Sequence, residues 1–318
     1  HIKNSYASET PITDGERVYA YFGNHGLYCF SVEGKQLWKK EWPAYKTRYS
    51  WGLAASPVLH KGRLYIVNDN EEQSFLVALD AKTGKEVWRV DRSDKSNWST
   101  PYIWENKLRT EIITPGTQKN RAYDLNGRLL YQFGGNSSIT IATPYAKFGL
   151  LYVTSGYVGD PKKPMFAIRP GAKGDISLES DKDKNEYVAW CQRRAGPYNP
   201  STIIYDDLMY VLLDRGLAAC YEAKTGKHVY GPERVVPRAG AFTSSPWAYN
   251  GKVFFLDENG VTYVLQTGRK FKILHTNRLN AKEDMCMATP AMVGDKLIIR
   301  TDARVYCFMK SREGSERR

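Results

Sequence analysis

The stretch SSPWAYNGKVFFL, residues 244–256, predicts a strand, a tight turn and a second strand. The same pattern returns as ATPAMVGDKLIIR at 288–300 and as ETPITDGERVYAY at 9–21. The chain contains seven such copies, each opened by Ser or Thr, and in six of them a Pro follows at once. The copies start near residues 10, 56, 100, 143, 201, 245 and 289. Seven copies at a nearly constant period indicate a repeat architecture.

Each copy is built from short apolar runs and shows no helical pattern of adequate length. The runs are rich in Val, Ile, Tyr, Phe and Leu, as in FLVALD at 75–80, and turn residues bound them. Such runs are typical of β-strands. One hydrophobic position, occupied by Tyr19 in the first copy, recurs in the others, but Arg109 breaks it in the third. With the segment around the Pro as one strand, each copy supplies four antiparallel strands.

A single sheet of this kind cannot bury its two apolar faces, whereas several copies packed radially can. We therefore predict an all-β fold, a β-propeller of four-stranded antiparallel blades, with seven repeats in one domain over 1–318. The seventh repeat lacks a run for its outer strand, which an eighth repeat upstream in the complete protein would supply. Two segments are expected outside the blades, a polar loop insertion at 171–187 and a mobile tail at 311–318. The closure of the ring and the oligomeric state stay open.

An aromatic residue stands four positions after a turn glycine in four of the copies, as Trp38 does after Gly34. A large aromatic at the same place in successive repeats is expected to pack one blade on the next. The predicted blade-docking residues are Trp38, Trp88, Tyr131 and Tyr230.

Charge and cysteine content exclude several classes of protein. The net charge is +12, but the basic residues are spread along the chain, so contact with an anionic surface stays open and nucleic acid is not an expected partner. No run of 18 apolar residues occurs, so no transmembrane segment is expected. The five cysteines form no Cys-x-x-Cys pair and the five histidines are scattered, so no metal site is expected. The disulfide status of the cysteines stays open.

The phrases YIVNDNEEQSFLVALDAKTGKEVW (65–88) and LAACYEAKTGKHVY (217–230) resemble the PQQ-like β-propeller repeat family. Ala78, Asp80, Gly84 and Trp88 carry the resemblance most closely. The family includes quinoprotein alcohol dehydrogenases and non-enzymatic outer-membrane assembly factors of the BamB type. The resemblance implies a bacterial periplasmic or secreted protein, and it implies a structural role for Trp38 and Trp88.

The resemblance leaves three functions open. The first is a non-catalytic binding or assembly scaffold without a cofactor. The second is a PQQ-dependent oxidoreductase, whose site as implied by the family needs a disulfide of neighbouring cysteines and a calcium ion held by Glu and Asn. The third is a propeller subunit of a larger enzyme complex. This chain has no adjacent cysteine pair, which favours the scaffold.

The loops that enter the Ser/Thr-Pro strands are rich in aromatic and polar residues. In a propeller these loops face the central channel, where exposed aromatics and arginines offer the contacts that a protein or glycan partner needs. The candidate binding residues are Tyr6, Arg48, Tyr49, Trp51, Trp98, Asn136, Tyr198, Arg238, Phe242 and Met285.

Overall fold

The computed structural model describes residues 1, 3–213, 215–237, 240–279 and 284–309. In this part of the chain the only helical segments are two short 3₁₀ turns, η1 (Gly23–His25) and η2 (Arg48–Ser50). The predicted fold class is confirmed: the chain is all-β and of the β-propeller type, with seven sheets in sequence order. The sequence predicts one domain, and contacts divide the chain into two compact units, residues 1–198 with 224–226 and residues 199–223 with 227–318. The predicted tail at 311–318 lies outside the described residues.

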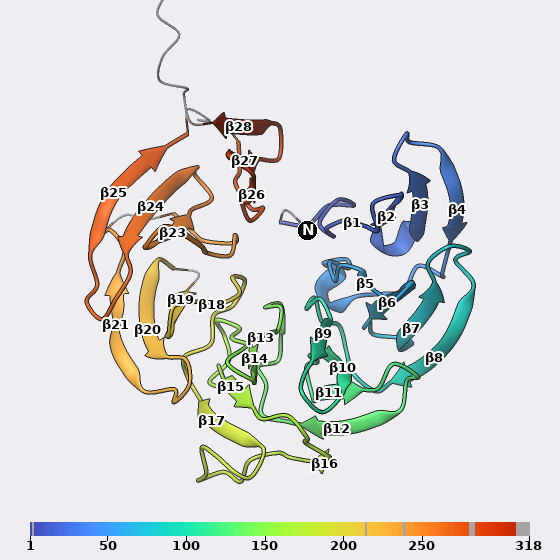
Figure 1. The fold of residues 1–318 in the computed structure, drawn as a ribbon, viewed down its shortest axis with the longest axis horizontal. Helices are drawn as coiled ribbons and strands as arrows, with labels where there is room; N and C mark the ends of the chain where they lie inside the picture. The colour runs from blue at the N-terminus through green and yellow to red at the C-terminus, as the bar shows by residue number, and fades with distance from the viewer. Residues whose placement is uncertain (2, 214, 238–239, 280–283, 310–318) are drawn as a thin grey trace, which may run out of the picture. The chain divides into compact units, whose positions relative to one another are not determined.

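The first unit holds four sheets, which fan out with their first strands innermost (Figure 1). The first sheet contains β1 (Ile12–Thr13), β2 (Arg17–Tyr21), β3 (Leu27–Ser31) and β4 (Gln36–Lys40). The second contains β5 (Val58–His60), β6 (Arg63–Asn68), β7 (Ser74–Asp80) and β8 (Glu86–Arg92). The third contains β9 (Tyr102–Glu105), β10 (Thr110–Thr114), β11 (Asn120–Tyr123) and β12 (Leu129–Phe133). The fourth contains β13 (Tyr145–Lys147), β14 (Leu150–Thr154), β15 (Met165–Ile168) and β17 (Val188–Gln192). The innermost strands β1, β5, β9 and β13 contact one another in that order, as in adjacent propeller blades.

The second unit holds the last three sheets. The fifth sheet contains β18 (Ile203–Tyr205), β19 (Leu208–Leu213), β20 (Leu217–Glu222) and β21 (His228–Arg234). The sixth contains β22 (Trp247–Tyr249), β23 (Lys252–Leu256), β24 (Val261–Gln266) and β25 (Ile273–Arg278). The seventh contains β26 (Ala291–Val293), β27 (Lys296–Arg300) and β28 (Val305–Met309), so its described residues form three strands where the other repeats form at least four.

The strand register explains the repeated sequence pattern. The first strand of every sheet begins two residues after its repeat start. Ile12 pairs with Tyr19, whose side chain is fully buried in the core. In the third sheet Tyr102 pairs with Ile113 instead, because the hairpin between β9 and β10 is longer. Arg109 lies in this longer hairpin, which is why it breaks the hydrophobic position.

Indole rings join neighbouring sheets of the first unit. The Trp38 ring lies against Gly84 in the turn of the next sheet, and its Nε1 donates to the carbonyl of Ala81 at 3.2 Å. A Cβ at Gly84 would lie 2.6 Å from that ring, so the glycine is needed for this approach. Trp88 likewise donates to the carbonyl of Leu125 at 3.0 Å. Both tryptophans therefore tie one sheet to the next through a ring contact and a hydrogen bond.

The other two predicted docking residues are also packed. Tyr131 is buried in the core of the first unit beside Phe133, with 6.5 Å between ring centroids. Tyr230 is half-buried in the second unit and lies 5.9 Å from the ring of Phe271.

The insertion at 171–187 differs from the polar loop that the sequence predicts. Its short strand β16 (Gly174–Asp175) pairs in parallel with β12 as a fifth strand of the third sheet. Ile176 is buried in the core of the first unit, and Arg109 donates to the carbonyl of Ala172 at 2.5 Å. The longest continuous exposed stretch of the insertion is residues 179–186. The few apolar residues of this polar segment produce no regular period, so the sequence pattern could not indicate this packing.

The burial of the cysteines predicts which thiols a reagent can reach in the folded protein. All five are free thiols, and Cys307 on the edge strand β28 is the exposed one. Because a thiol must be accessible to react, we expect a thiol reagent to label the native protein at Cys307 and all five cysteines after unfolding. Absorbance titration with a disulfide reagent, followed by peptide mapping, measures both numbers. Equally fast labelling of the buried Cys29 in native protein would contradict this prediction.

Candidate functional site

The loop at 47–52, between β4 and β5, presents aromatic side chains from the first unit. Thr47 Oγ1 accepts the Gly52 amide at 2.8 Å, and the Arg48 amide donates to Ser96 Oγ at 2.9 Å. Tyr49 and the residue after it both have positive φ, 53° and 56°. A left-handed conformation costs a non-glycine residue about 1 kcal/mol or more, and such strain is common in binding loops. The hydrogen bonds therefore hold Tyr49 in a strained position, where its side chain is 62% exposed.

Four predicted residues meet at this loop, and we call Arg48, Tyr49, Trp51 and Trp98 the Trp51 cluster. The Trp51 ring lies 5.1 Å from the Tyr49 ring and 5.5 Å from the Trp98 ring. The guanidinium of Arg48 lies 5.1 Å from the centre of the Tyr49 ring. Trp98 is buried and donates from Nε1 to the carbonyl of Gly52 at 2.7 Å. The cluster thus passes from a buried anchor to an exposed ring, which is the form of a protein-binding hot spot.

Tyr6 is the fifth predicted residue in this region. Its side chain is exposed, and its ring lies 4.4 Å from the ring of His25. Tyr6 and Trp51 line the same pocket of the first unit.

The remaining predicted residues lie elsewhere. Asn136 is buried, where its amide donates to the carbonyl of Gly116 and accepts from Asn120 at 2.7 Å. Tyr198 packs against Tyr157, with 5.2 Å between the rings. The interior hydrogen bonds of Asn136 give it a structural role instead of the predicted place at a binding surface.

In the second unit Phe242 is fully buried, 5.9 Å from the ring of Tyr263, and belongs to the core. This burial leaves no side-chain surface for the contact that the sequence predicts, because an aromatic in a loop can equally fill the core. Met285 is half-buried, and its amide donates to Asp302 Oδ1 at 2.8 Å. Arg238 lies outside the described residues.

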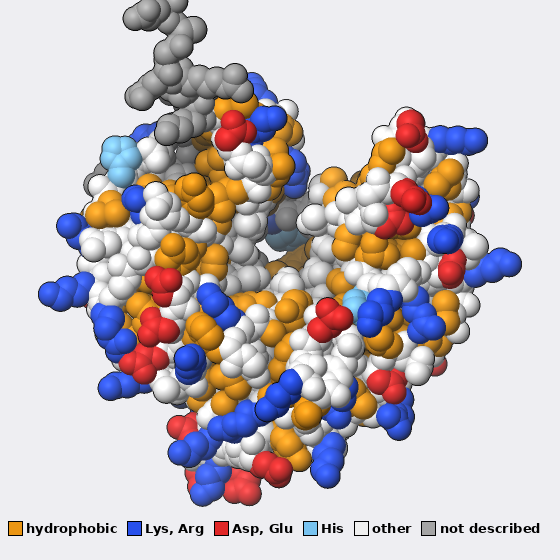
Figure 2. Space-filling view, in the orientation of Figure 1, with side chains coloured by type: hydrophobic (Ala, Val, Ile, Leu, Met, Phe, Trp, Pro, Cys, Tyr) orange, Lys and Arg blue, Asp and Glu red, His pale blue; other side chains and the backbone are white. Residues whose placement is uncertain are grey.

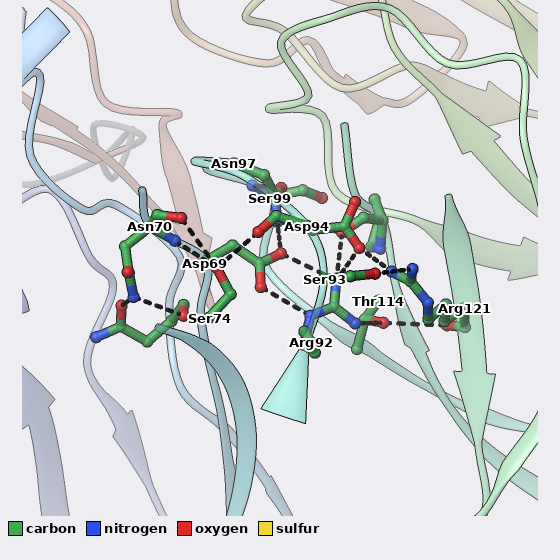
Figure 3. A network of polar contacts seen from close by, with 12 residues as sticks. Asp69, Asn70, Ser74, Arg92, Ser93, Asp94, Asn97, Ser99, Thr114 and Arg121 are labelled. Carbon is green, nitrogen blue, oxygen red and sulfur yellow. Dashed lines mark hydrogen bonds and ion pairs between the residues drawn. The ribbon is translucent and has the colours of Figure 1, made fainter. Parts of the chain in front are cut away.

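A buried ion-pair network holds the segment that carries Trp98 (Figure 3). Arg92 at the end of β8 donates from Nε and Nη2 to the two carboxylate oxygens of Asp69, at 2.7 and 2.9 Å. Asn97 Nδ2 donates to the same carboxylate at 2.7 Å, and Arg121 pairs with Asp94. The side chains of Arg92, Asp69 and Asp94 have no exposed surface.

The surroundings of Arg92 in this network favour its charged form. Burial opposes the charge of Arg92, but the attraction and hydrogen bonds of Asp69 outweigh it and raise the pKa of the guanidinium. Two carboxylates face two guanidinium groups, so the network balances its own charge. It fixes residues 94–97, directly before Trp98, and thereby supports the Trp51 cluster.

Glu9 is a residue of the site that sequence reasoning missed. It is 4% exposed, and both carboxylate oxygens lack a hydrogen-bond partner among the described residues. The signal lay in the repeat, since Glu9 stands directly before a repeat start, where the other copies have a small residue or Pro. Those residues are Ala55, Ser99, Ala142, Pro200, Ser244 and Ala288.

The surface charge of the described residues indicates no second candidate site on the face shown in Figure 2. On the face shown in Figure 2, Lys and Arg side chains are spread over the surface of each unit and do not gather in one block. No helix in the described part of the chain has the length and apolar composition needed to cross a bilayer.

The chain matches, over residues 23–317, the family model described as outer membrane protein assembly factor BamB. It belongs to the BamB family. BamB from Moraxella catarrhalis is similar in structure, with a TM-score of 0.71 and 12% sequence identity over 94% of this chain and 85% of that one. A search of curated proteins finds no match.

Two further solved structures share the fold with this BamB-family chain. A europium-containing methanol dehydrogenase has a TM-score of 0.66 and 11% identity, covering 91% of this chain and 72% of that one. The computationally designed Ika8 protein has a TM-score of 0.53 and 12% identity, covering 94% and 95%. At this identity the likenesses show the fold alone.

The resemblance to the PQQ-like repeat family raises the question of a site for PQQ with calcium. The resemblance implies a pair of neighbouring cysteines and a calcium ligand set. The sequence has no adjacent cysteines. In the described part of this BamB-family chain, no group of three or more His, Cys, Asp or Glu side chains is placed to hold a metal ion. The described residues therefore do not supply the neighbouring cysteine pair or a carboxylate-rich metal cluster of the kind that the resemblance implies.

Proposed function

We propose that this chain is a non-catalytic scaffold that binds a protein partner through the Trp51 cluster. The observation that carries the proposal is the exposed Tyr49 ring, held in a strained conformation beside Arg48 and Trp51. Rigid aromatic rings give large contact area at a low cost in conformational entropy, and Arg adds directional donors.

The family supports this choice of partner and of compartment. Its description names an outer membrane protein assembly factor, which favours a protein partner over a glycan and the bacterial periplasm as the place of action. The partner belongs to the apparatus that assembles outer membrane proteins, and this chain contributes binding surface to it, not chemistry.

The test replaces the exposed part of the cluster and leaves the buried anchor in place. A Tyr49→Ala, Trp51→Ala variant should lose partner capture at least about tenfold, because hot-spot aromatics contribute about 2 kcal/mol or more each. Its folding should persist, because Trp98 and the ion-pair network remain. The measurement is cross-linking in the bacterial envelope, followed by affinity purification and quantitative mass spectrometry.

Tyr249 in the second unit provides a matched control, since its side chain is 62% exposed, as is that of Tyr49. A Tyr249→Ala variant should capture the same partners as wild type. Equal capture by the Trp51-cluster variant and this control would refute the proposed binding surface.

A further inference from the structure

A pocket of about 320 Å³ opens beside the Trp51 cluster in the first unit. Its lining includes Asn4, Tyr6, Glu9, Phe22, Trp51 and Leu53. Asn4 fixes one wall, because its Nδ2 donates to the carbonyls of Trp51 and Leu53 at 2.5 and 3.0 Å. The pocket is thus a hydrogen-bonded feature of the fold, and its size suits a small ligand or one long side chain.

Glu9 gives this pocket an unpaired acid. Its carboxylate oxygens lie just beneath the pocket surface and have no hydrogen-bond partner among the described residues. A Cβ at Gly23 would lie 3.3 Å from Oε1, so the glycine leaves room for the carboxylate. A buried carboxylate without a partner is expensive in free energy, and such a group is kept where a ligand completes it.

The rest of the lining indicates what that ligand is. The residues that line the pocket include no Lys or Arg, while the rings of Tyr6, Phe22 and Trp51 supply faces that attract a cation. A carboxylate among aromatic rings is a recognition site for an organic cation. We infer that this pocket binds a primary ammonium group through Glu9, supplied by a lysine side chain or by a free alkylamine. The assignment of the ammonium to a lysine of a protein partner rests on the proposed function, whereas the presence of an ammonium site does not.

When the ammonium binds, the Glu9 side chain must rotate and its carboxyl group must lose a proton. The Glu9 carboxylate must turn from beneath the surface toward the ammonium, and no other residue in the described part of the chain holds it by a hydrogen bond. Burial raises the pKa of Glu9 to about 8, against a smaller opposite effect of its own backbone amide. At pH 7 the acid therefore passes its proton to the buffer as the ammonium binds, and affinity rises with pH until about pH 8.

Few other titratable groups face this carboxylate. Tyr21 on β2 lies close enough to Glu9 for the negative charges of an ionised phenol and carboxylate to repel each other. The Tyr21 hydroxyl accepts a hydrogen bond from Asn68 Nδ2 at 3.1 Å. His1 and Tyr6 line the pocket, and His25 contacts Tyr6. None of these side chains carries a fixed positive charge.

The experiment is calorimetric titration of the whole chain with n-butylammonium chloride at pH 7, in two buffers of different ionisation enthalpy. We expect saturable binding with release of nearly one proton, and no binding of the neutral n-butanol. A Glu9→Gln variant should lose at least about tenfold in affinity and release no proton, because it keeps the shape but not the charge. A Glu16→Gln variant removes a charge from an exposed turn of the same sheet and should bind as wild type does.

Binding of butylammonium by Glu9→Gln with wild-type affinity, or no binding by wild type, would overturn the inference. The source of the ammonium group is then decided by a second experiment, in which the lysines of the envelope partner are acetylated before its capture by this chain is measured. Lost capture assigns the ammonium to the partner's lysine, and unchanged capture assigns it to a free amine. Tyr49→Ala alone leaves the pocket lining intact, so it tests the proposed function separately from the ammonium site.

Discussion

A Glu9→Gln variant should be markedly more stable than wild type at pH 8 and nearly equal to it at pH 4. Burial raises the pKa of Glu9 from 4.5 to about 8 in the folded chain. Between these pH values the folded chain holds a proton that the unfolded chain has lost. The stability of wild type is therefore full below pH 4.5 and falls as the pH rises through about 8.

The loss is about 1.4 kcal/mol for each pH unit, so it reaches on the order of 4 kcal/mol at pH 8. Gln cannot ionise and has the shape of the protonated acid, so the variant avoids this loss. Urea unfolding at pH 4, 6 and 8 measures the difference, with Glu16→Gln as the control for loss of an exposed charge. If the free energies of unfolding of Glu9→Gln and wild type changed with pH in parallel, the Glu9 carboxylate would not lie in a low-dielectric site.

The repeat made most of the fold predictable. Each copy holds short apolar runs separated by turn residues, and four copies also carry the recurring aromatic, so all seven sheets could be placed from the repeat starts. The exceptions are local. Arg109 breaks the pattern because its hairpin is longer, and Ile176 is buried although it stands in a polar insertion. The longer hairpin changes the spacing within one repeat, and the burial of Ile176 depends on contacts with segments far apart in the chain, so no periodicity encodes either exception.

The candidate site was predictable only in part. Loop composition brought together Arg48, Tyr49, Trp51 and Trp98, because successive inner loops of a propeller lie side by side. The same composition rule also selected Phe242, which fills the core. An aromatic side chain is equally suited to a core and to an interface, so residue type alone cannot separate the two.

The second large effect is expected from the buried network. An Arg92→Met variant should lose about 3–5 kcal/mol of unfolding free energy, because it leaves the Asp69 carboxylate buried without its guanidinium. Of the network's side chains in the described part of the protein, Asn97 would remain as a donor to Asp69. Urea unfolding at neutral pH measures the loss.

Arg89 provides the matched control, because it lies on the same strand and pairs with Glu86 at the surface, at 3.1 Å. Arg89→Met should cost only about 1 kcal/mol, since an exposed pair is weak. An Arg92→Met, Asp69→Leu double variant should recover part of the loss, because it removes both buried charges together. If Arg92→Met instead behaved as Arg89→Met does, the Asp69 carboxylate would have to be solvated, and residues 94–97 would have no rigid support for the Trp51 cluster. The cost of breaking the pair therefore measures how firmly the fold positions its binding surface.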